Sequence, residues 1–157
     1  MYQWKNIFLC VFLVFSNSIF ASDKPIKIGI VTFLSGPAAG PFGVPAKIAA
    51  DAIVESLNAG KVPHPYNSTG FSGRKIELVY VDEAGGASKQ VTEFRNLVSR
   101  QKVDFVIGYI SSGDCLAIPP VADELKTLTV LMDCGTPRVF EENDYKYVFR
   151  TRAHSTM

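Results

Sequence analysis

The feature that most constrains the fold of this chain is an alternation of short β-branched segments with longer segments of helical periodicity. The strand-like segments are residues 26–33, 75–82, 104–109, 128–132 and 147–149. Between them, apolar residues recur every three or four positions in residues 43–58, 91–98 and 118–125. Strands that alternate with helices predict a parallel sheet covered on both faces, because the crossover connections are right-handed. The sequence therefore predicts an α/β fold with a doubly wound parallel sheet.

The first 21 residues have the order of a secretory signal peptide. A basic residue precedes an apolar run at residues 7–15, and small residues then lead to Ala21. A membrane anchor is the alternative, but this run is far shorter than the roughly 20 residues that span a bilayer. We therefore expect cleavage after Ala21, loss of Cys10 with the signal, and export of residues 22–157 to the periplasm.

Composition limits the size of the domain and the class of its partners. The 157 residues are 47% hydrophobic and 20% charged, which suits one compact domain and leaves no room for a second. Removal of Lys5 with the signal leaves 15 basic against 15 acidic residues, without a basic stripe. Because nucleic-acid binding depends on neutralising phosphates, we exclude a DNA or RNA partner.

The chain lacks the residue patterns of common catalytic sites. It has two histidines, neither at a predicted strand end, and no Gly-x-Ser-x-Gly or Walker sequence. The glycines of residues 36–43 lack the Gly-x-Gly-x-x-Gly spacing that admits a pyrophosphate. We therefore expect no catalytic activity, no cofactor and no metal site.

Two cysteines remain in the mature chain, Cys115 and Cys134. An even number of cysteines in an exported protein is compatible with a disulfide. The two follow successive predicted strands, so we expect them to lie close enough to pair. Two buried thiols that behave as small apolar residues are the alternative.

Small, polar and glycine-rich segments follow three of the predicted strands, at residues 35–43, 111–114 and 133–137. Ligands of doubly wound sheets bind outside the carboxyl ends of the strands, where the winding reverses. Hydroxyls and free amides at the start of a helix suit a carboxylate, so Ser111 and Ser112 are the first candidates for such a contact. The alternative is that these serines, like Asp114, only cap the helix.

Four blocks of the sequence follow one another in a distinctive order: Ile26-Lys27-Ile28-Gly29-Ile30 with Leu34-Ser35-Gly36-Pro37 and Phe42-Gly43; Val81-Asp82-Glu83-Ala84 with Lys89-Gln90; Val106-Ile107-Gly108-Tyr109-Ile110-Ser111-Ser112; and Gly135-Thr136-Pro137. In these blocks and their order the chain resembles the leucine/isoleucine/valine-binding proteins, a family of periplasmic solute-binding proteins of ABC transporters. The resemblance covers essentially the whole mature chain. Members have two lobes of the type 1 periplasmic binding fold, close on a small solute and carry no catalytic machinery.

The resemblance implies that residues 22–157 are the N-terminal lobe of such a protein, without the second lobe. The ligand would be a small amino acid or a related amide or carboxylic solute, held in the cleft between lobes. The further partner would be an ABC permease in the inner membrane, and the protein would be a monomer. The alternative from another class is the ligand-sensing domain of a receptor or of an amide-responsive regulator, which shares this fold.

The resemblance also implies roles for single residues. Ser112 would donate a hydroxyl to the solute's carboxylate, and Thr136 would be its partner on the next loop. Gly135 would offer backbone groups, and Phe42 takes the place of the family's aromatic residue beside the ligand.

Two departures from the family pattern indicate a divergent member. Ser111 stands where members often have a disulfide cysteine, and the segment after Asp82 lacks the other half of that bridge. Asp133 stands in a strand end that is usually apolar and small. Asp133 is therefore a candidate to meet a cationic group on the solute.

Overall fold

The computed structural model describes residues 24–157, so the predicted signal peptide and Cys10 lie outside the described residues. The elements are β1 (Ile26–Thr32), η1 (Ala39–Gly43), α1 (Val44–Asn58), β2 (Ile76–Asp82), α2 (Ala87–Asn96), η2 (Leu97–Gln101), β3 (Phe105–Gly108), α3 (Ser112–Glu124), β4 (Thr129–Leu131), α4 (Arg138–Glu141) and β5 (Val148–Arg150). Within this part of the chain, no helix has both the length and the apolar character needed to cross a bilayer.

The strands form one parallel sheet in the order β2-β1-β3-β4-β5. Each neighbouring pair runs in the same direction, as in the register that places Ile30 beside Ile107 and Ile107 beside Val130. The direction of winding reverses at β1, so the point at which ligands bind such sheets lies between β1 and β3. The predicted doubly wound α/β fold is confirmed.

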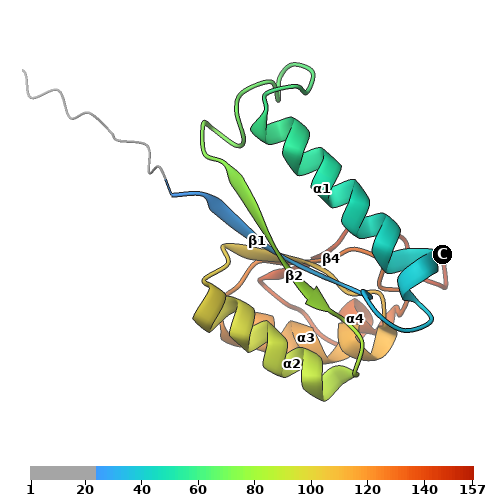
Figure 1. Ribbon diagram of the computed structural model, residues 1–157. Helices are drawn as coiled ribbons and strands as arrows, with labels where there is room; N and C mark the ends of the chain where they lie inside the picture. Colours follow the sequence, from blue (N-terminus) through green and yellow to red (C-terminus); the bar gives the residue numbers. More distant parts are fainter. Residues whose placement is uncertain (1–23) are drawn as a thin grey trace, which may run out of the picture.

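The helices cover the two faces of the sheet unequally. Figure 1 shows α2, α3 and α4 on one face and α1 alone on the other. The buried core lies on the first face, where strand residues such as Val31, Val106 and Leu131 pack with Phe94 and Ile118. Each fully buried side chain of this kind contributes about 1.5–3 kcal/mol of transfer free energy. This face therefore supplies most of the apolar burial that holds the fold.

The face under α1 is apolar but only partly packed. No residue of α1 is buried, and an apolar hollow lies between the helix and the sheet, lined in part by Ile30, Ile53 and Ile107. Val130 and Phe149 continue the row of Ile107 across β4 and β5. Phe149 is 55% exposed, so the outer part of this face has no helix over it.

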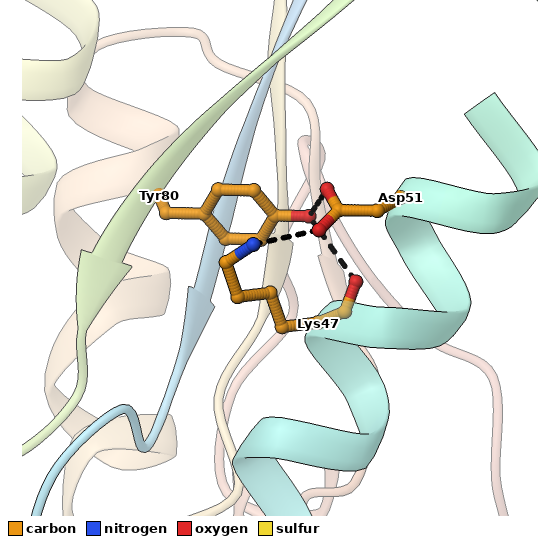
Figure 2. Close-up of polar contacts among 3 residues, drawn as sticks. All are labelled: Lys47, Asp51 and Tyr80. Carbon is orange, nitrogen blue, oxygen red and sulfur yellow. Dashed lines mark hydrogen bonds and ion pairs between the residues drawn. The ribbon is translucent and has the colours of Figure 1, made fainter. Parts of the chain in front are cut away.

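Polar contacts attach α1 to β2 at the middle and at the end of the helix. Figure 2 shows Asp51 accepting a hydrogen bond from the Tyr80 hydroxyl at 2.6 Å and pairing with Lys47 at 2.6 Å. Burial, together with this hydrogen bond, raises the pKa of Tyr80, so the hydroxyl stays a donor at neutral pH. At the end of the helix, the Asn58 amide bonds both the N–H and the C=O of Ile76 at 2.8 Å each.

Candidate ligand-binding site at the carboxyl edge of the sheet

The loops that follow β1, β3 and β4 start side by side at the carboxyl edge of the sheet, as the sequence predicts. The Tyr109 N–H donates to the Val31 carbonyl at 3.1 Å, and the Asp133 N–H donates to the Tyr109 carbonyl at 3.3 Å. The C-terminal end of the chain reaches the same edge (Figure 1), where the Ser155 N–H donates to the Gly135 carbonyl at 2.9 Å. The candidate residues from three loops are thus brought to one edge.

The start of α3 presents one serine to solvent and uses the other as a cap. Ser111 is the N-cap, and its hydroxyl accepts a hydrogen bond from the Asp114 N–H at 3.4 Å. Ser112 is the first residue of α3 and is exposed, and no hydrogen bond joins its hydroxyl to another described residue. Ser111 therefore has the capping role that the sequence left open. The exposed Ser112 hydroxyl lies at the N-terminal end of α3, which is the positive end of the helix dipole.

Two hydrogen bonds hold Thr136 in the loop between β4 and α4. The Thr136 hydroxyl accepts a hydrogen bond from the Arg138 N–H at 3.3 Å, and its carbonyl accepts one from the Arg150 guanidinium at 2.7 Å. Asp133, on the same loop, forms an ion pair with Arg152. The charge of Asp133 is therefore already paired within the chain.

Phe42 lies in η1, next to the carboxyl end of β1, and is 49% exposed. The following residue, Gly43, comes so close to β1 that a Cβ there would lie 1.6 Å from the Phe33 carbonyl oxygen. Because only glycine fits this approach, Gly43 fixes η1 against Phe33. The ring of Phe42 is thereby held beside the edge where the loops meet.

Asp82, the last residue of β2, holds the loop after β1. Its Oδ1 accepts the N–H groups of Leu34 at 2.9 Å and Ala84 at 3.1 Å, and its Oδ2 accepts the Ser35 hydroxyl at 2.5 Å. Burial opposes ionisation, but these hydrogen bonds outweigh it and lower the pKa of Asp82 to about 2. The carboxylate therefore stays charged and anchors the loop at neutral pH.

Glu83, the next residue, holds the loop after β3 in the same way. It is fully buried, and its Oε1 accepts the N–H groups of Ile110 and Ser111 at 2.7 Å each. The sequence places Asp82 in a predicted strand and both residues in a family block, but this function was not predicted. The signal that was available is a pair of acidic residues at the end of an apolar strand.

Cys115 and Cys134 lie beneath these loops, Cys115 in the first turn of α3 and Cys134 after β4. Both are buried free thiols that contact each other. The hydrogen bond between the thiols, together with burial, raises the pKa of Cys115. The disulfide itself stays a prediction. Across residues 24–157, no group of three or more His, Cys, Asp or Glu side chains is placed to hold a metal ion.

In a comparison with protein families, one family matches this chain. The family described as periplasmic binding protein matches residues 25–157. A comparison with curated proteins gives no match.

Several solved structures of transporter binding proteins are similar to this chain. The branched-chain amino acid transporter substrate-binding protein LivJ from Streptococcus pneumoniae, in complex with isoleucine, is 25% identical with a TM-score of 0.69, over 83% of this chain and 34% of that one. An ABC transporter solute-binding protein from R. palustris, in complex with 4-hydroxybenzoate, is 26% identical with a TM-score of 0.68, over 83% and 32%. A periplasmic binding protein from Burkholderia mallei is 25% identical with a TM-score of 0.67, over 85% and 33%. The chain thus spans about a third of the length of these structures.

Proposed function

The chain belongs to the periplasmic binding protein family, and from this membership we propose that it binds a small solute with a carboxylate group for an ABC importer. The observation that carries the proposal is the exposed hydroxyl of Ser112 at the start of α3, next to the Thr136 loop. Ser112 lies three residues before Cys115 and Thr136 two residues after Cys134, and the contact between the two cysteines brings the start of α3 near the Thr136 loop. Hydroxyls and a helix N-terminus that meet at one point suit an anion.

The ligands of the similar proteins support a carboxylate. Isoleucine and 4-hydroxybenzoate, bound by the proteins from S. pneumoniae and R. palustris, share a carboxylate and little else. Arg150 and Arg152 lie beside the Thr136 loop and favour negative charge there. An amino acid would also bring an ammonium group, which would compete with Arg152 for Asp133.

In this proposal each candidate residue has a separate role. Ser112 donates its hydroxyl to the carboxylate, and Thr136 adds a second hydroxyl from the neighbouring loop. Gly135 offers backbone groups, and Phe42 flanks the solute. No side chain acts as a catalyst, and the ligand leaves unchanged.

We also propose that residues 22–157 form one lobe of a two-lobed, monomeric protein that encloses the solute between its lobes. The length of the similar structures supports this, because this chain spans about a third of them. The apolar, partly packed face under α1 supports it as well, since an apolar surface of this kind marks an interaction site. The whole protein would work in the periplasm and deliver its solute to an inner-membrane permease.

The test is a thermal-shift screen with isoleucine and 4-hydroxybenzoate as first probes, followed by other amino acids, amides and aromatic acids. A solute that binds only the native state raises Tm. Ser112→Ala and Thr136→Ala should each weaken binding by about 10- to 100-fold, because a hydrogen bond to a charged group contributes about 1.5–3 kcal/mol. Ser88→Ala is a matched control, since Ser88 is also an exposed serine in the first turn of a helix, here α2.

Two outcomes would contradict the proposal. A solute whose Tm shift is unaffected by Ser112→Ala and Thr136→Ala binds at another site. If no small solute shifts the Tm of the folded, two-lobed protein, solute binding is contradicted, both for transport and for ligand sensing.

A further inference from the structure

Glu83 has one carboxyl oxygen with two donors and one with none. Its Oε1 accepts the N–H groups of Ile110 and Ser111, directly after Tyr109, whose backbone takes the left-handed φ of 67°. Its Oε2 is buried and has no hydrogen-bond donor among the described residues. A buried, ionised oxygen without a donor is strongly unfavourable, so this oxygen requires a proton.

A second carboxyl, that of Asp114, lies beside Glu83. Asp114 is 2% exposed, and its side chain is in hydrogen-bonding contact with Glu83. Burial raises the pKa of Asp114, whereas the Ser111 hydroxyl and Glu83 oppose this shift. Two ionised carboxylates repel each other, whereas one proton placed between them gives both a partner.

The other titratable groups around this pair do not neutralise it. Tyr109 and Cys115 face the two carboxyls, and both stay neutral, because burial raises the pKa of Tyr109 and the thiol hydrogen bond raises that of Cys115. Cys134 also lies near Glu83, and the positive charge of the nearby Arg150 helps to lower the pKa of Cys134. From α2, the Gln90 amide donates to the Asp82 carbonyl at 3.0 Å and carries no charge.

We propose that Glu83 and Asp114 share one proton beneath the loop after β3, and that Glu83 is a positioning residue that places Ser111 and Ser112 for the solute. The Oε1 oxygen holds the two backbone N–H groups of the loop. The Oε2 oxygen carries the proton and donates it to Asp114. The role in binding rests on the proposed function, whereas the shared proton exists without any ligand.

Loss of the shared proton weakens both the fold and the site. Burial, aided by Asp114, raises the pKa of Glu83 from 4.5 to about 7. Because the pKa of the folded state is the higher one, the stabilisation is complete below pH 4.5 and is lost as the pH rises through 7. A second negative charge then lies under the loop that receives an anion, so affinity for a carboxylate solute falls over the same range.

Conservative variants of Glu83 and Asp114 distinguish the effect of the shared proton from a merely structural role of these two side chains. In Glu83→Gln the amide oxygen still accepts both N–H groups, and the amide nitrogen donates permanently to Asp114. In Asp114→Asn the new amide donates to Oε2 of Glu83, which then ionises normally. Both variants should lose the pH dependence between 6 and 8 and keep the loop in place. Glu77→Gln, an exposed glutamate on β2, is the matched control and should keep the wild-type profile.

The first experiment is an NMR titration of the full chain, with ¹³C-labelled glutamate carboxyls and the amides of Ile110 and Ser111 observed from pH 4 to pH 9. One carboxyl should titrate near pH 7 together with both amides, and this transition should be absent from Glu83→Gln. The shared proton is overturned if every glutamate titrates near its ordinary pKa, or if the two amides titrate unchanged in Glu83→Gln.

The second experiment measures the binding of isoleucine and 4-hydroxybenzoate at pH 6 and pH 8. If only the protonated site binds, the affinity of the wild type falls about tenfold between these values, whereas that of Glu83→Gln stays constant. An unchanged wild-type affinity would overturn the positioning role. Failure of every solute to bind would contradict the proposed function alone, because the carboxyl titration needs no ligand.

Discussion

At the scale of single residues, two adjacent acidic side chains organise the candidate site. Asp82 and Glu83 lie at the end of β2 and accept backbone N–H groups from the loops after β1 and β3, the two strands at which the winding reverses. Loops that present groups to a ligand lie outside the regular hydrogen bonding of the sheet. Carboxylates that bind their N–H groups therefore give these loops a fixed geometry.

The contact between Cys115 and Cys134 supports a prediction at the same scale. We expect the two thiols to form a disulfide in protein exposed to an oxidising compartment, because they are buried against each other. The measurement is a thiol count on oxidised, then unfolded, mature protein, which should find no free thiol. Cys115→Ser should expose one thiol, from Cys134. Two free thiols in the oxidised wild type would show that the pair stays reduced.

At the scale of elements, α1 depends on polar contacts more than on burial. None of its residues is buried, and Asn58 forms two hydrogen bonds with the backbone of Ile76 at the start of β2. Asn58→Ala should lower the free energy of unfolding by about 1–2 kcal/mol, since both bonds are lost. Urea unfolding measures this change. Glu55→Ala, at an exposed position of the same helix, should change stability much less.

The regular elements of this fold are largely predictable from the sequence. Periodic apolar residues predict β1 to β5 and the three long helices, because burial against a sheet requires those spacings. The helix α4 spans only Arg138–Glu141, too few residues to show a period. Its start follows Pro137, which was predicted to lie in the loop after the fourth strand and in a family block, not before a helix.

The candidate site is only partly predictable, because its geometry depends on contacts between distant residues. The sequence predicts that Ser112, Thr136 and Gly135 lie at one edge of the sheet, because each of them follows a predicted parallel strand. The bond of Glu83 to Ile110 joins residues 27 positions apart, and no local pattern indicates it. The pairing of Asp133 with Arg152 likewise appears only in the folded chain.

At the scale of the whole molecule, the two faces of the sheet differ in a way that fits a part of a larger protein. The face with α2 and α3 holds the buried core, whereas the face with α1 is apolar and partly open. In our account the remainder of a two-lobed protein covers the open face, and a second lobe completes the cleft above Ser112. Half of such a cleft would bind weakly, because closure supplies the contacts that bury the ligand.

The most direct test of this account is a crystal structure of the protein with the carboxylate solute that stabilises it most. We predict that one carboxylate oxygen lies within about 3 Å of the Ser112 hydroxyl, a usual hydrogen-bond length, and that the Thr136 hydroxyl contacts the same ligand. A carboxylate bound away from the start of α3, or turned toward solvent, would contradict the central claim.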